Sequence, residues 1–501
     1  RPGGWDSGLF SNKDALTGRE EAVAGGRKWA EAAQKADDFW ASLFKHDDWV
    51  GGPTLVKRVW HRAYLEAVWH LDTTTNGFPM PNTRGVAMHE PFKDCGDDET
   101  AADAPPSEKY FAVLALDGDA IGKWVSGEKA PPFKSQLADY KDGSGAVRLG
   151  ARTYFERSEF KEFLEKQRPL SPGYHLQFSE ALANFALLCA RPIVEAFDGR
   201  LIYAGGDDVL ALLPADTALA CAQALRLAFR GSPELESFLQ AQASQLRDRH
   251  QAAQDSNPEA LPPPYYQKLA AESGLLDSPA AGFLRRRDLV DQQDRPIPFL
   301  VPGPAADCSV GIAIAHFKAP LQDVVRAAQA AEKQAKKTLG RSAVAITLFK
   351  RSGETVEWGC KWGDGGLDLY RAIAEALKDN QLSAKFPHRV IELLDPYLTR
   401  KTGISKLQTT KDFDDNVNEI IQADCAVACE RQKGSKWDGD LPRRLNDLLS
   451  NYLSSPASSD TKDGHPTEQK LERVIGLCQT VAFAHRTSAE EPSSAEKQDT
   501  P

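Results

Sequence analysis

The stretch LIYAGGDDVLALLP, residues 201–214, consists of two apolar runs joined by the turn Gly205-Gly206-Asp207-Asp208. Two apolar runs around a short glycine-containing turn predict a β-hairpin. Gly205 and Gly206 let the turn take up positive φ, and they leave room for a bulky group to approach the backbone. The hairpin therefore places two adjacent carboxylates, Asp207 and Asp208, at its exposed tip.

The segments on either side of this hairpin extend it into a sheet. The run YFAVLAL, residues 110–116, predicts a buried strand and ends abruptly in Asp117-Gly118-Asp119. The predicted elements are strands over 110–116, 200–204, 209–213 and 308–317 and helices over 176–197 and 214–230, followed by a helix over 321–339 and a strand over 343–350. The order β-α-β-β-α-β predicts an α+β fold of the ferredoxin-like type, a mostly antiparallel sheet with helices on one face.

The remainder of the chain differs in composition from this centre. We predict a mostly helical N-terminal region over 1–108, an α+β domain over 109–354 with an insertion at 231–306, a helical C-terminal domain over 355–487 and a disordered tail over 488–501. The insertion contains three consecutive prolines, so part of it is expected to be loop. Trp60 and Trp69 fall at core spacing on a predicted helix, which favours packing over base stacking.

Composition limits the class of protein. The 501 residues are 41% hydrophobic and 26% charged, with a formal net charge of −10. This balance indicates a soluble globular protein, and the acidic charge argues against coating nucleic acid by bulk electrostatics. No apolar run approaches the roughly 20 residues that span a bilayer. We expect a cytoplasmic protein without membrane partners and, because the chain begins with Arg1, a truncated or processed product.

The eight cysteines include no CxxC pair. Several lie in apolar runs, which favours buried thiols in a reducing compartment. Cys425 and Cys429 are one helical turn apart and can share a metal, but nothing nearby in the sequence completes four zinc ligands. A structural thiol pair is therefore favoured over a zinc site.

Asp117 and the pair Asp207-Asp208 form the constellation that points to chemistry. In the predicted topology they end neighbouring strands, so the three carboxylates can meet in space. Such a cluster repels itself unless a cation compensates it, and hard oxygen ligands suit Mg²⁺ or Mn²⁺. Two such ions can clamp the attacking and leaving oxygens of a nucleotidyl transfer. Gly and Asp also dominate ordinary hairpin turns, so a purely structural turn is the alternative.

The same residues carry a family resemblance. The runs ALDGDAIGKWVSG (115–127), LIYAGGDDVLALLP (201–214), SVGIAIAHF (309–317) and RAAQAAEKQAKKTLGR (326–341) resemble the nucleotide-cyclase palm of the large subunit of type III CRISPR–Cas effector complexes. The Cmr branch, subtype III-B, fits best. The segment over 55–87 resembles the region just ahead of this GGDEF-like palm.

The resemblance implies an antiviral nucleotidyltransferase that makes cyclic oligoadenylates from ATP when its RNA-guided complex binds target RNA. It implies Asp117, Asp207 and Asp208 as magnesium ligands, with the latter two as the catalytic acidic pair. It places Lys336 on the triphosphate, with Ser179 and Asn184 near the adenine and ribose. The implied partners are the other Cmr subunits, CRISPR RNA and target RNA. For Lys336, a solvated lysine on an exposed helix face is the alternative.

The sequence also departs from the family pattern. His46-Asp47 lacks the further His and Asp ligands of an HD nuclease, so a helix cap or loop is favoured and DNase activity is not expected. Only one β-α-β-β-α-β unit is recognised, whereas joining two nucleotides in this family takes two facing palms. We therefore expect the isolated chain to bind ATP with metal and make little product. Two alternatives remain, a diguanylate-cyclase-like enzyme and a catalytically silent scaffold subunit.

Overall fold

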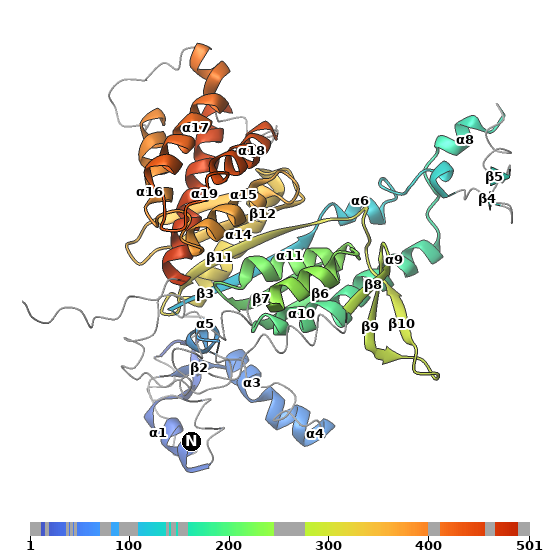
Figure 1. Ribbon diagram of the computed structural model, residues 1–501. Coiled ribbons are helices and arrows are strands. Elements are labelled where there is room, and N and C mark those ends of the chain that lie inside the picture. The colour runs from blue at the N-terminus through green and yellow to red at the C-terminus, as the bar shows by residue number, and fades with distance from the viewer. Residues whose placement is uncertain are drawn as a thin grey trace, which may run out of the picture. The chain divides into compact units, whose positions relative to one another are not determined.

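The computed structural model in Figure 1 describes residues 12–15, 20–36, 40, 44, 48–70, 82–89, 109–136, 140–141, 147–148, 159–244, 276–398, 411–455 and 466–488. The dipeptide His46-Asp47, the three prolines at 262–264 and nearly all of the predicted tail lie outside these ranges. The chain divides into two units, Arg1–Met80 and Pro81–Pro501, which are described separately.

The N-terminal unit combines helices with a small sheet. Its elements are β1 (Ala22–Gly25), α1 (Arg27–Ala36), β2 (Trp49–Gly51), α3 (Gly52–Trp60), a π-helical segment (His61–Glu66) and α4 (Ala67–Trp69), with β1 and β2 antiparallel. The prediction that Trp60 and Trp69 pack in a core is wrong, because these side chains are 46% and 63% exposed. Trp60 stacks instead on Tyr64, with ring centroids 4.3 Å apart. Helical spacing shows that two residues share a face, but not whether that face is covered.

A six-stranded sheet dominates the described part of the second unit, in the order β13-β12-β11-β3-β7-β6. The strands are β3 (Tyr110–Gly118), β6 (Arg200–Gly205), β7 (Asp208–Pro214), β11 (Cys308–His316), β12 (Ala343–Phe349) and β13 (Thr355–Lys361). The four strands β11-β3-β7-β6 are antiparallel neighbours, which agrees with the predicted ferredoxin-like arrangement and the α+β class. β12 adds to this unit in parallel with β11.

The predicted boundary at residue 354 is wrong, because the sheet continues through β13. Val356, Trp358 and Cys360 alternate with more exposed neighbours along this strand, and all three are buried. This period of two is the pattern of an edge strand with one covered face. The helical region therefore begins after Lys361 rather than at residue 355.

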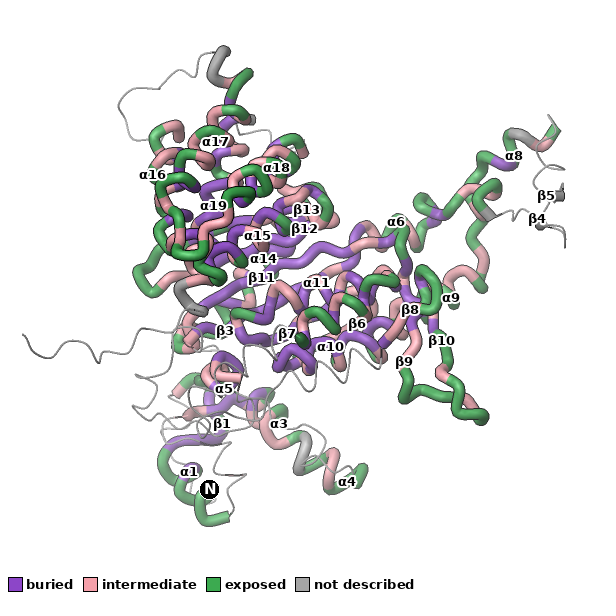
Figure 2. The backbone as a smooth tube through the Cα atoms, in the orientation of Figure 1, coloured by how far each residue is buried: buried purple, intermediate pink, exposed green. Residues whose placement is uncertain are grey.

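Helices cover both faces of the sheet, which corrects the prediction of helices on one face only (Figure 2). One face of β3 carries Ala112, Leu114 and Leu116, which pack against a first set of helices. The other face carries Phe111 and Val113, which pack against a second set. The first set is α9 (Pro172–Asn184), a π-helical segment (Phe185–Ala190), α10 (Arg191–Ala196) and α11 (Ala218–Phe229); the second is α5 (Thr83–Ala87) and α14 (Leu321–Lys337).

The reason lies in the central strands, which are apolar on both sides. In β11 the residues between the large apolar side chains are Gly311, Ala313 and Ala315, and all of β11 except His316 is buried. The alternation of Val310, Ile312 and Ile314 favours a half-buried strand from sequence alone, and that interpretation is wrong. A strand without a polar face needs cover on both sides, and small residues let a helix approach closely.

The C-terminal residues form a helical bundle, as predicted. Its helices are α15 (Gly366–Lys378), α16 (Phe386–Leu394), α17 (Lys411–Arg431), α18 (Leu441–Ser454) and α19 (Pro466–Ser488). Trp358 of β13 connects the sheet to this bundle, since its indole Nε1 donates to the Tyr452 hydroxyl at 3.2 Å. No helix in the described ranges is both long enough and apolar enough to cross a membrane.

The insertion also contains regular structure. Between residues 276 and 300, β8 (Leu276–Ala280), β9 (Phe283–Val290) and β10 (Pro296–Leu300) form a three-stranded antiparallel sheet. Arg285 of β9 pairs with Asp277, and its neighbour Arg286 pairs with Asp288, in both cases with a closest approach of 2.6 Å. Arg286 also donates to the Leu188 carbonyl at 3.1 Å, so these arginines have structural partners within the protein.

Candidate metal and nucleotide site

The sheet brings three predicted carboxylates together at one of its ends. Leu116 of β3 is paired with Val209 of β7, so the next opposing position places Asp117 beside Asp208. Asp207 lies in the turn before β7, and its carbonyl accepts a hydrogen bond from the Gly118 N–H at 3.2 Å. One carboxylate oxygen from each of the three aspartates lies within 4.8 Å of the others. We call these three residues the acidic triad.

Two glycines make this approach possible. A Cβ at Gly118 would lie 2.8 Å from the Cβ of Asp207, so only glycine lets the hairpin turn come this close to β3. Gly206 has φ +72°, and the nearest atom to a Cβ there is Leu182 Cβ, at 3.9 Å. The turn thus needs glycine for its backbone conformation and keeps open space beside it.

Gly205 departs from the prediction that both turn glycines take up positive φ, because among the described residues only Gly206 of the two does. Gly205 belongs to β6 and pairs with Asp208. A side chain there would collide with the Tyr203 ring, which folds over it. Its role is therefore to make room for Tyr203 rather than to reverse the chain.

Without a cation, burial and mutual repulsion disfavour the charged forms of the triad's carboxyl groups. Partial burial, followed by repulsion from Asp117 and Asp207, raises the pKa of Asp208 from its usual 3.8 to about 6. Burial is also the main cause that raises the pKa of Asp207, with a contribution from Asp117. Negative charge is therefore disfavoured where three carboxylates converge, and a bound cation would reverse this effect.

Lys336 reaches the triad from α14. Its Nζ contacts Asp117 Oδ2, lies 3.1 Å from Glu332 Oε1 and lies 3.4 Å from the Gly118 carbonyl oxygen. Burial lowers the pKa of Lys336, but the hydrogen bond and charge of Asp117, followed by those of Glu332, outweigh it and raise the pKa overall. The side chain is only 17% exposed, so the alternative of a solvated helix-surface lysine is wrong.

Glu332 is the residue at this site that sequence reasoning missed. It is 8% exposed on the face of α14 that packs on the sheet, among Ala328, Ala331 and Ala335. The signal was present in the sequence, since a glutamate on the apolar face of an amphipathic helix, four residues before a lysine, is an unusual residue to bury.

Ser179 and Asn184, the predicted adenine and ribose contacts, both lie on α9. The helix passes the turn at Leu182, and Ser179 is exposed one helical turn before that residue. Asn184 has a structural partner, because its Nδ2 donates to the Leu300 carbonyl of β10 at 3.0 Å. The nucleotide contact of Ser179 remains a prediction, and Asn184 would have to exchange its partner to make one.

The second aspartate of the DGD run points into the protein. Asp119 is 5% exposed and accepts hydrogen bonds from the Ser309 hydroxyl at 2.8 Å and from the Ser342 N–H at 2.7 Å. Nearby, Asp307 accepts two bonds of 2.7 Å from Arg226. Asp119 and Asp307 thus stabilise the strand ends around the triad, whereas Asp117 is part of the triad itself.

The donor set of the triad fits Mg²⁺ or Mn²⁺. Both ions take carboxylate oxygens, water and substrate phosphates as ligands, and Asp208 is exposed enough to leave positions for water or phosphate. In the described residues, these three aspartates are the only group of three or more His, Cys, Asp or Glu side chains with a metal-ligand arrangement.

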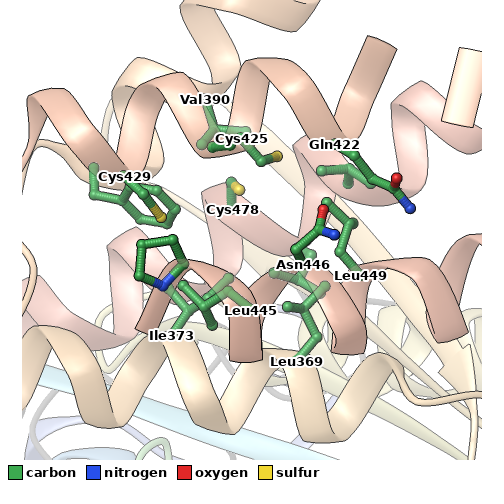
Figure 3. A pocket seen from close by; sticks show the side chains of 15 residues that line it. Leu369, Ile373, Val390, Gln422, Cys425, Cys429, Leu445, Asn446, Leu449 and Cys478 are labelled. Atoms are coloured by element: carbon green, nitrogen blue, oxygen red, sulfur yellow. The ribbon is translucent and has the colours of Figure 1, made fainter. Parts of the chain in front are cut away.

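The predicted thiol pair lies in the C-terminal bundle. Cys425 and Cys429 line an apolar pocket together with Cys478, and Figure 3 shows all three side chains around it. Burial raises the pKa of Cys429 and of Cys478 to about 12, so these thiols are neutral. The metal-ligand group found among the described residues does not include these cysteines.

Comparison with known proteins places the triad inside a family domain. Residues 110–245 match the family model "Cas10/Cmr2, second palm domain", a range that contains all three aspartates but not Lys336. A curated relative, "CRISPR system Cmr subunit Cmr2" of Pyrococcus furiosus, is 30% identical over 250 residues, which is 50% of this chain and 19% of the relative. "CRISPR system CMR subunit Cmr2" of Saccharolobus solfataricus is 40% identical over 73 residues, 14% of this chain and 7% of the relative.

Two solved structures are also similar. They are titled "Type III-B Cmr-beta Cryo-EM structure of the Apo state" and "Cryo-EM structure of the Type III-B Cmr-beta bound to cognate target RNA". The first has a TM-score of 0.38 at 14% identity and covers 69% of this chain and 38% of that one. The second has a TM-score of 0.36 at 15% identity and covers 63% and 34%. The chain matches less than a fifth of the length of the curated relatives.

Proposed function

Since the chain belongs to the Cas10/Cmr2 family, we propose that its α+β domain is a magnesium-dependent nucleotidyltransferase palm that makes cyclic oligoadenylates from ATP. The observation that carries the proposal is the convergence of Asp117, Asp207 and Asp208 within 4.8 Å at the end of the sheet. The raised pKa of Asp208 adds to it, because an external cation would stabilise the cluster.

The residues divide the work of such a site. Asp117, Asp207 and Asp208 would hold Mg²⁺ or Mn²⁺, which when bound neutralises charge on the attacking and leaving oxygens of a nucleotidyl transfer. Gly206 leaves open space beside the turn for a nucleotide, and Lys336, next to Asp117, would supply a positive charge to its phosphates. Positioning and charge neutralisation then supply the rate, without a covalent intermediate.

We further propose that the chain acts in the cytoplasm as one subunit of an RNA-guided antiviral complex. The curated relatives are named as subunits of CRISPR Cmr systems, and this chain shares their second palm. The partners would be the other Cmr subunits, CRISPR RNA and target RNA. Binding of target RNA would be the event that switches on synthesis.

The test is incubation of a complex assembled with this chain, labelled ATP, Mg²⁺ and target RNA, followed by separation of the products. We expect cyclic oligoadenylates, and their loss in Asp117→Asn, which keeps the side chain's shape but removes a charge that the metals need. Dinucleotides made in preference from GTP would favour a diguanylate-cyclase-like enzyme. An intact complex without any nucleotide product would favour the scaffold.

The isolated chain provides a second arm of this test. One palm positions one nucleotide, and correct placement of two substrates supplies much of the rate of joining them. We therefore expect the isolated chain to bind ATP with metal and to synthesise little, with activity appearing in the assembled complex. Efficient synthesis by a verified monomer would show that a second nucleotide site lies within these residues.

A further inference from the structure

Lys336 contacts Asp117, one of the three carboxylates of the acidic triad. Its ammonium is surrounded by three oxygens: Asp117 Oδ2, Glu332 Oε1 at 3.1 Å and the Gly118 carbonyl at 3.4 Å. An ammonium carries a positive charge and only donor groups, so each of these oxygens attracts it. A carboxylate and a carbonyl are also the oxygen types that divalent cations prefer.

The fold holds Lys336 in this place. Glu332 lies one helical turn earlier on α14, and its side chain is 11% exposed. The backbone of α14 at Glu332 lies directly on β11, because a Cβ at Gly311 would collide with the Glu332 nitrogen and the Ala328 carbonyl oxygen. Glycine at position 311 therefore sets the height of α14 above the sheet, and with it the reach of Glu332 and Lys336.

A divalent cation and this ammonium compete for Asp117. Two positive groups a few ångströms apart in a partly buried site repel each other strongly, so a metal bound to Asp117 requires Lys336 to move. A nucleoside triphosphate offers the ammonium a new anionic partner beside the old one. Removal of Lys336 from Asp117 is then linked to the arrival of the phosphates.

We propose that Lys336 is a built-in counter-ion of the metal site, retained by Glu332, and that it leaves Asp117 when a triphosphate takes its ammonium. Metal and nucleotide then bind cooperatively, each raising the affinity of the other by the same factor. The inference rests on the proposed function, because it takes the triad as a metal site and a nucleoside triphosphate as its ligand. It assigns Glu332 as a positioning residue, acting through Lys336.

The experiment measures Mn²⁺ binding to the full chain by electron paramagnetic resonance, with and without α,β-methylene-ATP, so that no turnover is needed. For the unsubstituted chain we expect weak binding of Mn²⁺ alone and an increase of at least about fivefold with the analogue. Lys336→Met should bind Mn²⁺ alone at least about fivefold more tightly than the unsubstituted chain, and the analogue should add little. Lys333→Met is the matched control on the exposed face of α14 and should behave like the unsubstituted chain.

Two further variants separate charge from shape. Lys336→Arg retains the positive charge, so weak binding of Mn²⁺ alone should be preserved. Glu332→Gln loosens the hold on Lys336, so Mn²⁺ alone should bind more tightly than to the unsubstituted chain and the enhancement by the analogue should shrink. Unchanged or weaker binding of Mn²⁺ alone in Glu332→Gln would overturn the retaining role of Glu332.

The outcomes separate this inference from the function on which it rests. If the unsubstituted chain binds Mn²⁺ with the analogue but Lys336→Met binds Mn²⁺ alone no more tightly, the counter-ion role is overturned and the metal site stands. If the unsubstituted chain binds no Mn²⁺ even with the analogue, the metal site and the counter-ion role both fall.

Discussion

Opposite ends of the same sheet carry two carboxylate clusters that are stabilised in different ways. At the end where β7 finishes, His89 lies between two aspartates, with Nδ1 3.3 Å from Asp198 Oδ2 and Nε2 3.2 Å from Asp216 Oδ1. Burial alone would lower the pKa of His89, but the two carboxylates outweigh it and raise it from 6.5 to about 10. At the other end, the ammonium of Lys336 contacts Asp117, one of the three carboxylates of the triad.

The difference shows how a structural charge cluster is distinguished from a candidate binding site. The His89 cluster contains its own cation, held on both sides by carboxylates, and it fastens α5 to the sheet. In the triad, Lys336 contacts Asp117, while Asp207 and Asp208 have raised pKa values. An acidic cluster whose charge is not balanced within the protein has a capacity for an external cation.

The largest effect is expected from removing two carboxylates of the acidic triad. Asp207→Ala combined with Asp208→Ala should lower oligoadenylate synthesis by the assembled complex at least about 100-fold, because the metal ligands are lost. The turn is partly exposed, so thermal unfolding should not move downward. The rate of product formation and a melting curve of the chain check both parts, and synthesis within tenfold of the unsubstituted complex would refute the metal assignment.

The second prediction concerns the His89 cluster at the opposite end of the sheet. His89→Gln leaves Asp198 and Asp216 without their cation, so we expect a loss of about 3 kcal/mol in the free energy of unfolding near pH 6. Because the folded pKa is raised above the unfolded value, the stabilisation is complete below about 6.5 and disappears as the pH rises to about 10. Urea denaturation at pH 6 and pH 10 measures it, and equal losses at the two pH values would contradict the ion-pair interpretation.

The third prediction concerns the close packing of α14 on β11, which positions Lys336 and Glu332 beside the triad. Gly311→Ala should push α14 away from β11 and cost about 2 kcal/mol in the free energy of unfolding, since the added methyl meets backbone. Gly363→Ala is the control, because a Cβ there has nothing within 4 Å, and it should stay within about 0.5 kcal/mol. Indistinguishable urea midpoints for the two variants would show that α14 has room to spare.

The smallest expected effect is a gain in stability. Asp208→Asn removes a charge that the metal-free fold disfavours, so the melting temperature at pH 7 should rise by a few degrees, about 1 kcal/mol after solvent screening. The pKa of Asp208 is raised from 3.8 to about 6, so unsubstituted protein gains stability as the pH falls through this window. The two melting temperatures should therefore converge near pH 4, and a lower melting temperature for the variant at pH 7 would contradict the repulsion.

The convergence of the triad could be predicted because it depends on topology alone. Asp117, Asp207 and Asp208 each lie at a strand end, and the strand order follows from the apolar pattern. The position of α14 could not be predicted in this way, because the small residues of β11 are compatible with either an exposed or a tightly covered face. The inward turn of Asp119 and the contact of Asn184 with Leu300 depend on partners more than 100 residues away.

The most direct test of the metal assignment is anomalous X-ray diffraction from crystals of the chain grown with Mn²⁺ and α,β-methylene-ATP. We predict Mn²⁺ bound to carboxylate oxygens of Asp117, Asp207 and Asp208 at about 2 Å, and none between Asp198 and Asp216, where His89 already supplies the positive charge. Nucleotide bound in the crystal with no Mn²⁺ on the three aspartates would contradict the assignment.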